Sequence, residues 1–226
     1  MKINFDNPLP HDTMEKKRNP SIVSSIPRYS DVFALDSFNQ NNIRLMLDTA
    51  RRFSVRPLFL CSPTEFHVYK RNFLSSQNIN NDSSFLYGII IRKPYRCMDI
   101  QKAQNLSSII FVEADDNLRV TLEQTKGITF FGMEHNQVID GMHARYSGLD
   151  HVMVAIASKR NHSFCTSFFD VLQLSKSKQA IFLGRVKQNI MLCQKKKVSY
   201  TVFSFAKSVA MIKKELLSIH NIISSK

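Results

Sequence analysis

Apolar runs alternate with amphipathic stretches along most of the chain. Short apolar runs, as expected for strands buried on both faces, occupy residues 32–35, 57–61, 85–91, 109–112, 128–132, 162–168 and 198–205. Stretches with apolar residues at helical spacing occupy residues 41–53, 64–74, 99–105, 117–125, 148–160, 178–195 and 209–223. This alternation predicts an α/β fold with a parallel sheet. By itself it does not distinguish an open doubly wound sheet from a closed barrel.

The spacing of apolar residues also assigns faces to three of the helices. In residues 148–160 the inward stripe is Leu149, Val152, Met153, Ile156 and Ala157, which leaves His151 and Ser158 on the opposite face. In residues 117–125 the inner positions are Leu118, Thr121, Leu122 and Thr125, and Arg119 lies off that face. In residues 178–195 the inward positions are Leu183, Val186, Ile190 and Cys193. Arg185 is then expected on the outer face of this long helix.

The chain is long enough to form one sizeable core. Residues 1–30 are rich in proline and contain a lysine–arginine cluster, which predicts an irregular basic arm. Residues 31–226 are expected to form a single domain. The polar stretch at residues 75–84 suits a surface loop, and it is also the best candidate for a linker if the chain formed two small domains.

The charge indicates the kind of partner. Lysine and arginine total 31 against 18 acidic residues, which gives a net charge of +13. Such a field attracts phosphate backbones and predicts nucleic-acid contact. No segment is long and apolar enough to cross a membrane, and the amino terminus does not resemble a secretory signal, so no membrane partner is expected. Cys61, Cys97, Cys165 and Cys193 are far apart, which predicts reduced, mostly buried thiols rather than a zinc site.

Motifs of common enzymes are missing from the sequence. It contains no G-x-x-x-x-G-K-[ST], no G-x-G-x-x-G and no G-x-S-x-G, and its seven histidines never form H-x-H. The acidic residues and histidines between Glu134 and His151 match no metal-ligand spacing. We therefore expect no catalytic residue and no bound metal. A stand-alone metal-dependent phosphoesterase of the barrel type remains the alternative.

Two segments carry a family resemblance. The first contains Val112-Glu113-Ala114 followed by Leu118-Arg119-Val120, and the second is Gly148-Leu149-Asp150-His151. Together they resemble the barrel-forming protein subunit of archaeal and eukaryotic ribonuclease P, often called protein component 3, and more closely its archaeal members. The resemblance continues more weakly through GRVKQNIMLCQKKKV and SFAK to about Lys207.

The resemblance implies a TIM-barrel-like (β/α) repeat and a function. The family usually has a further segment after the SFAK-like strand, so the last strand–helix unit is expected to be missing or replaced here. The implied function is that of a non-catalytic RNA-binding subunit, which stabilises the catalytic RNA for removal of the 5′ leader from precursor tRNA. The implied partners are ribonuclease P RNA, precursor tRNA through the complex, and a small αβ-sandwich protein subunit. Magnesium is expected on the RNA, with no cofactor on the protein. The expected location is the cytoplasm for an archaeal protein and the nucleus for a eukaryotic one.

Basic residues near strand and helix ends are the candidate RNA contacts. If the sheet is parallel, residues that follow strands or begin helices converge at one end of the barrel. On that basis five basic residues are expected to share one rim: Arg92, Lys93, Arg119, Arg145 and Lys207. His151, at the start of its helix, either pairs only with Asp150 or a neighbouring carbonyl or, as the resemblance favours, has an RNA-contact or structural role in the binding face. For Arg119 the alternative is an ion pair with Glu123, four residues further on. The remaining candidates are Lys159, Arg160 and Arg185. The lysines at 195–197 are read as a solvated helix end that the helix dipole favours.

Overall fold

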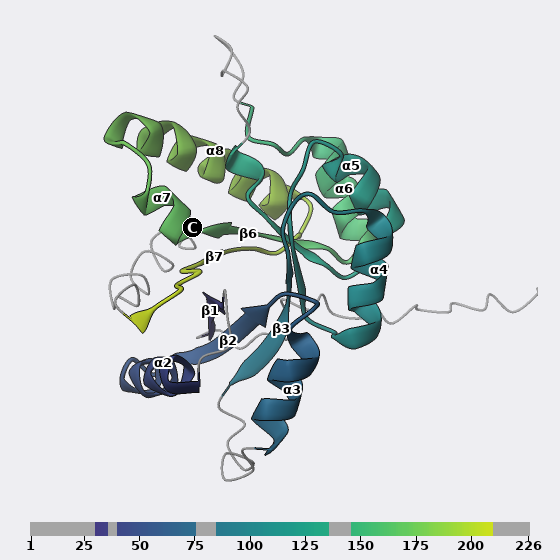
Figure 1. Cartoon of the computed structure of the whole chain (residues 1–226). Helices are drawn as coiled ribbons and strands as arrows, with labels where there is room; N and C mark the ends of the chain where they lie inside the picture. The colour runs from purple at the N-terminus through teal and green to yellow at the C-terminus, as the bar shows by residue number, and fades with distance from the viewer. Residues whose placement is uncertain (1–29, 36–39, 76–84, 136–145, 210–226) are drawn as a thin grey trace, which may run out of the picture.

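Seven parallel strands form the sheet of this protein. The computed structural model describes residues 30–35, 40–75, 85–135 and 146–209. Each strand pairs with the next along the chain. The strands are β1 Ser30–Ala34, β2 Arg56–Cys61, β3 Leu86–Ile91, β4 Ile110–Glu113, β5 Thr129–Phe131, β6 Ser163–Ser167 and β7 Tyr200–Phe203. Figure 1 shows them gathered at the centre of the molecule with helices around the outside. The prediction of a TIM-barrel-like α/β fold with parallel strands is confirmed.

Helices connect successive strands. They are α2 Gln40–Arg52, α3 Phe66–Ser75, α4 Cys97–Leu106, α5 Leu118–Gln124, α6 His151–Arg160, α7 Phe168–Leu172 and α8 Lys176–Lys195, with a 3-10 turn, η2, at Met133–His135. The short helix α7 was not predicted. The side chain of Ser167 accepts a hydrogen bond from the Asp170 amide at 3.3 Å, which caps a helix directly after β6, where the predicted strand ended at residue 168. The predicted last helix, at residues 209–223, lies almost wholly outside the described residues.

The sheet closes on itself through residues 204–206, which follow β7. The Ser204 amide donates to the Asp31 carboxylate at 2.8 Å, and the Ser204 hydroxyl donates to the Val32 carbonyl at 3.2 Å. The Ala34 amide donates to the Ala206 carbonyl at 3.2 Å, and Phe33 bridges Ala206 in the parallel sense. A short irregular segment therefore occupies the place of a further strand in a nearly closed barrel.

Alternation along the strands produces two apolar layers. One set of residues points to the barrel interior: Val32, Ala34, Leu58, Leu60, Ile90, Phe111, Phe131, Cys165, Phe203 and Phe205. Phe111 on β4 meets Phe203 and Phe205, from the far side of the sheet, with ring centroids 6.0 and 6.1 Å apart. The intervening residues, such as Phe33 and Phe59, pack against the helices. Both strand faces are thus buried, which explains the uninterrupted apolar runs in the sequence.

A buried histidine braces α5 against the sheet. His162 Nδ1 accepts from the Ile128 amide at 3.2 Å, and its Nε2 lies 3.1 Å from the Leu122 carbonyl. Burial lowers the pKa of His162 to about 4, so the ring is neutral and Nε2 is its donor. In the core, this neutral histidine therefore links the Leu122 carbonyl of α5 to the Ile128 amide before β5.

Candidate functional site

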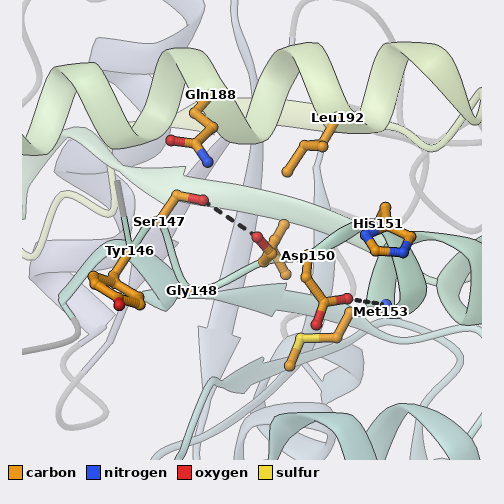
Figure 2. Close-up of a pocket in the computed structure, with 9 residues that line it drawn as sticks. Tyr146, Ser147, Gly148, Asp150, His151, Met153, Gln188 and Leu192 are labelled. Atoms are coloured by element: carbon orange, nitrogen blue, oxygen red, sulfur yellow. Dashed lines mark hydrogen bonds between the residues drawn. The ribbon is translucent and has the colours of Figure 1, made fainter. Parts of the chain in front are cut away.

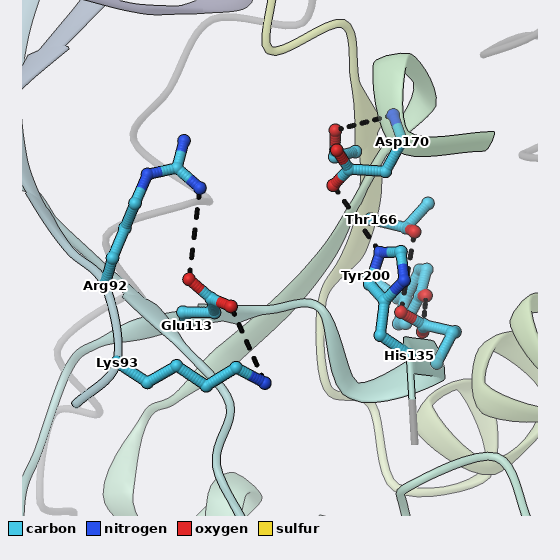
Figure 3. A network of polar contacts seen from close by, with 9 residues as sticks. Arg92, Lys93, Glu113, His135, Thr166, Asp170 and Tyr200 are labelled. Atoms are coloured by element: carbon cyan, nitrogen blue, oxygen red, sulfur yellow. Dashed lines mark hydrogen bonds and ion pairs between the residues drawn. The ribbon is translucent and has the colours of Figure 1, made fainter. Parts of the chain in front are cut away.

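A cluster of charged side chains lies at the carboxyl ends of β3 and β4. Arg92 Nη1 lies 3.9 Å and Lys93 Nζ lies 3.7 Å from the two carboxylate oxygens of Glu113, the last residue of β4. The Arg92 guanidinium also stands over the ring of Phe131, 5.8 Å from its centroid. Figure 3 shows both basic side chains reaching to the single carboxylate. The structure therefore brings Arg92 and Lys93 together, as predicted, and pairs both with Glu113 of the family motif.

A second ion pair faces this cluster across the same end of the barrel (Figure 3). His135 Nε2, in η2, lies 3.5 Å from the carboxylate of Asp170 on α7. Burial opposes ionisation of Asp170, but the hydrogen bond and charge of His135 outweigh it, and the pKa of Asp170 is lowered. A hollow of about 740 Å³ nearby is lined by residues that include Lys93, Asp115 and Asp116. Positive and negative side chains therefore alternate at this end of the barrel.

Arg119 lies early in α5, on its exposed face. Its predicted inner face is confirmed, since Leu118, Thr121, Leu122 and Thr125 are all buried. Arg119 Nε forms an ion pair with Glu123 Oε1 at 3.4 Å. An exposed pair of this spacing is worth roughly 0.3–0.5 kcal/mol, so it holds the arginine only weakly. Arg119 thus lies where predicted and remains accessible to a ligand.

His151 begins α6 beside a hollow of about 460 Å³ that α8 covers. Figure 2 shows Gln188 and Leu192 reaching from α8 toward the loop that carries Gly148 and Asp150. The helix was expected to begin at residue 148, but it begins at His151 because the Asp150 carboxylate caps it, accepting from the Met153 amide at 2.7 Å. The side chain of His151 is exposed and forms no hydrogen bond or ion pair with any residue that the structure describes.

The inward stripe predicted for α6 is partly wrong. Leu149 and Ala157 are buried, but so is Val154, which the pattern omitted, while Val152, Met153 and Ile156 are only partly buried. The reason is that α6 contacts α5 on one side and α8 on the other, so its buried surface is not a single stripe. His151 and Ser158 are exposed, as expected.

Arg185 does not lie on the outer face of α8, and that prediction is wrong. It is 7% exposed, and its Nη1 donates to the Glu134 carbonyl at 3.0 Å. Leu183, expected inside, is 43% exposed. The buried stripe of α8 is Phe182, Arg185, Val186, Asn189 and Cys193. Polar residues therefore occupy part of the buried face of α8. The prediction used apolar residues alone, and it placed the buried face on the wrong side of the helix.

The polar residues of α8 meet a buried carboxyl group that the sequence reading did not single out. Glu134 is 1% exposed and accepts from Asn189 Nδ2 at 2.8 Å and from the hydroxyl of Tyr200. Asn189 Nδ2 also donates to the Ser147 carbonyl at 2.9 Å. Burial raises the pKa of Glu134, although these bonds favour its charged form. The signal in the sequence was the spacing of Arg185 and Asn189, which are four residues apart and therefore share a helix face with Val186 and Cys193. Two polar residues on a buried face indicate a buried polar partner.

The other predicted contacts lie in different parts of the molecule. Lys159 and Arg160 form the last turn of α6, so they lie at the opposite end of the barrel from Arg92 and Lys93. Lys207 directly follows the closing segment and is partly buried. Arg145 lies outside the described residues. Of the five residues predicted to share a basic rim, Arg92, Lys93 and Arg119 lie at the carboxyl end of the barrel, and each of these three side chains is paired with a carboxylate.

In the described part of the chain, no three side chains of histidine, cysteine, aspartate or glutamate are grouped as metal ligands would be. Cys61, Cys165 and Cys193 are buried, as predicted, and burial raises the pKa of Cys61 and Cys193 to about 12. No helix within these residues is long and apolar enough to span a membrane.

The fold is similar to that of solved structures. No family model and no curated protein sequence matches the chain. A chain in the cryo-EM structure of archaeal ribonuclease P with mature tRNA is similar to it, with a TM-score of 0.65 and 18% identity over 85% of this chain and 82% of that one. The A. niger ochratoxinase is more distant, with a TM-score of 0.45 and 9% identity over 87% of this chain and 66% of that one. At these identities the likeness shows the fold, an α/β barrel.

Proposed function

We propose that this protein is an RNA-binding subunit of ribonuclease P that takes no part in the chemistry itself. One observation carries the proposal. The sequence resemblance at two short motifs and the structural likeness over most of both chains lead independently to the same ribonucleoprotein. The net charge of +13 supports an RNA partner, since a folded RNA is bound largely through its phosphates.

The motif residues divide into structural and contact positions. Gly148 and Asp150 have local structural roles. Gly148 allows the tight turn beside Met133, and Asp150 caps α6. Arg119 and His151 are exposed, and packing does not explain either residue. An arginine offers a planar fork for phosphate, and the first residue of a helix lies among unpaired amides that favour an anion. We infer that Arg119 and His151 contact RNA at the carboxyl end of the barrel.

In this role the protein lowers the amount of magnesium that the RNA needs. The catalytic RNA brings its own phosphates close together, and bound Mg²⁺ offsets their repulsion. Basic side chains at the protein surface supply part of the same positive charge. A small αβ-sandwich protein subunit and precursor tRNA complete the proposed assembly, in the cytoplasm of an archaeon or the nucleus of a eukaryote.

Reconstitution tests this function. The protein is mixed with ribonuclease P RNA and the small partner subunit, and cleavage of precursor tRNA is followed across Mg²⁺ concentration. We expect the protein to shift the Mg²⁺ requirement downward. Folded protein that produces no shift with cognate components would overturn the proposal. Turnover of a generic phosphate ester together with stoichiometric bound metal would favour a barrel phosphoesterase instead.

Two matched pairs of variants test the contact residues. Arg119→Ala removes the guanidinium, whereas Glu123→Ala breaks the same ion pair and leaves the guanidinium free. If Arg119 contacts RNA, only Arg119→Ala weakens the stimulation, and equal losses would point to the ion pair. His151→Ala is compared with His67→Ala, which removes an exposed histidine on α3, another helix of the outer layer. Equal activity of these two histidine variants would exclude His151 as a contact.

A further inference from the structure

The carboxyl-terminal third of the chain is almost free of acidic residues. Between Asp150 and Glu215 there is a single one, Asp170, against twelve lysines and arginines. Asp170 lies beside His135 at the carboxyl end of the barrel. The basic residues of this stretch that lie at the opposite end of the barrel therefore have no acidic residue near them in the stretch itself.

The fold gathers these cations where three helices end. The Arg160 carbonyl, at the end of α6, accepts from the Gly127 amide at 3.0 Å, which brings Lys126 beside Arg160. The Ser158 hydroxyl of α6 donates to the Lys196 carbonyl at 3.2 Å, which holds the end of α8 against α6. Six side chains thereby form what we term the basic patch: Lys126, Lys159, Arg160, Lys195, Lys196 and Lys197.

Every member of the basic patch is exposed. None of the six forms an ion pair with a carboxylate of the described residues, whereas Arg92, Lys93 and Arg119 at the other end all do. The acidic residue nearest in the chain is Glu123, and it is paired with Arg119. Unpaired cations require no rearrangement before they meet a phosphate, so the basic patch is better prepared for an RNA backbone than the paired end.

Helix dipoles explain part of this distribution, because cations are favoured at the carboxyl end of a helix. They do not explain Lys197, which lies beyond the end of α8 with φ of 56°. That left-handed conformation is strained for residues with a side chain and suits glycine. Lysine occupies this position in spite of that cost, and its side chain is exposed.

We propose that the basic patch is a contact surface for the phosphate backbone of structured RNA, at the end of the barrel opposite Arg119 and His151. In the described residues, the exposed large hydrophobic side chains include two aromatic ones, Tyr87 and Tyr146. Neither belongs to the basic patch or to α5, α6 or α8. The patch thus lacks a platform on which unpaired bases would stack, and it fits a helical RNA read through its phosphates. The proposal deepens the function proposed above and rests on it only for the identity of the RNA.

Direct binding of the full-length protein to a short RNA duplex tests the patch. Affinity is measured from about 50 to 200 mM KCl, because each phosphate contact adds about 0.9 to the slope of log affinity against log salt. Lys159→Gln with Arg160→Gln removes two charges from the last turn of α6. Arg51→Gln with Arg52→Gln removes two charges from the last turn of α2 and serves as the matched control. We expect the slope to become shallower by about 2 in the α6 variant and to stay unchanged in the control.

A second variant guards against misfolding at the end of α6. It replaces Lys195, Lys196 and Lys197 by glutamine, and a charge-preserving version replaces all three by arginine. Loss of affinity with glutamine and retention with arginine is expected, with thermal unfolding of both measured alongside. Equal loss in the α6 variant and the α2 control would mean that net charge alone acts, and would overturn the proposal. Unchanged binding in every patch variant would also overturn it, and would leave an acidic protein as the partner to test next.

The two proposals can fail separately. If the patch variants bind duplex RNA poorly but the wild-type protein does not stimulate precursor-tRNA cleavage, the basic patch is supported as an RNA contact and the ribonuclease P assignment is rejected. If the protein stimulates cleavage but the patch variants bind duplex RNA normally, the ribonuclease P assignment is supported and the basic patch is rejected as an RNA contact.

Discussion

Gly148 shows how a motif residue can be needed for the backbone alone. It has φ of 84°, and a Cβ built on it would lie 2.2 Å from the Met133 carbonyl oxygen. Gly132 has a similar φ of 80°, but a Cβ there would meet no atom closer than 3.7 Å. We expect Gly132→Ala to cost about 1–2 kcal/mol of unfolding free energy from the dihedral alone. Gly148→Ala should cost more than about 3 kcal/mol, because the clash adds to it. Urea denaturation measures both, and equal losses would contradict the steric argument.

The raised pKa of Glu134 predicts how the stability of the protein depends on pH. Burial raises its pKa above the ordinary value of 4.5, so the folded protein binds this proton more tightly than the unfolded chain does. The contribution of Glu134 to stability is therefore greatest below that value, and it decreases as pH rises toward the folded-state pKa. Glu134→Gln removes this titration. We expect the variant to gain stability relative to wild type as pH rises above the ordinary value of 4.5, measured by urea denaturation. A difference that does not change with pH would contradict a raised pKa.

At the scale of single residues, exposure was predictable where helix periodicity was clear. Arg119, His151 and Ser158 are exposed as expected, because apolar neighbours fix the buried side. Arg185 and Glu134 were misjudged or missed, because a buried polar residue is recognised only through a partner distant in the chain. Glu134 and Asn189 lie 55 residues apart, and the sequence does not show that they meet.

Helix α8 is fixed to the barrel by a polar anchor as well as by apolar packing. Asn189 is fully buried and donates to both Glu134 and the Ser147 carbonyl. Asn189→Ala leaves two buried acceptors short of a donor, and we expect a loss of about 2–3 kcal/mol in unfolding free energy. Gln194→Ala, at an exposed position of the same helix, should change stability by less than about 0.5 kcal/mol. Similar losses in the two variants would show that general helix propensity, and not the anchor, is responsible.

At the scale of elements, the strands were predicted closely and the helix starts less well. Apolar runs identify buried strands because both faces are covered, as at residues 57–61 against the observed Arg56–Cys61. The start of α6 was placed early, because Gly148 and Leu149 continue an apolar pattern that the Asp150 cap interrupts. The short helix α7 depends on one serine cap, which apolar periodicity does not detect.

At the scale of the whole molecule, Asp31 contributes one of the hydrogen bonds that close the barrel. Its carboxylate accepts from the Ser204 amide at 2.8 Å, and Ser204 in turn bonds to Val32. We expect Asp31→Ala to speed hydrogen exchange at the Ser204 amide, with little change in β4 and β5 on the far side. Asp31→Asn retains a side-chain oxygen and should protect that amide nearly as well as wild type. Uniform acceleration through all strands would show that Asp31 supports global stability and not the closure specifically.

The sequence alone left the architecture open between a sheet and a barrel. The distinction lies in a contact between residues 173 positions apart, to which strand and helix patterns are insensitive. The family resemblance indicated the barrel. It also led us to expect a missing or replaced final unit, and residues 204–206 close the ring where a further strand would stand. The charge distribution likewise emerged only once α6 and α8 were seen to end side by side.

The closure between β1 and residues 204–206 also bears on synthesis of the protein. A nascent chain that has not yet released Ser204 from the ribosome has an open sheet, with unpaired backbone groups on β1 and on its latest strand. Such edges are the groups through which incomplete sheets associate with other chains. The barrel can therefore close only after residues 204–206 have emerged, and until then β1 and the latest strand present open edges to neighbouring chains.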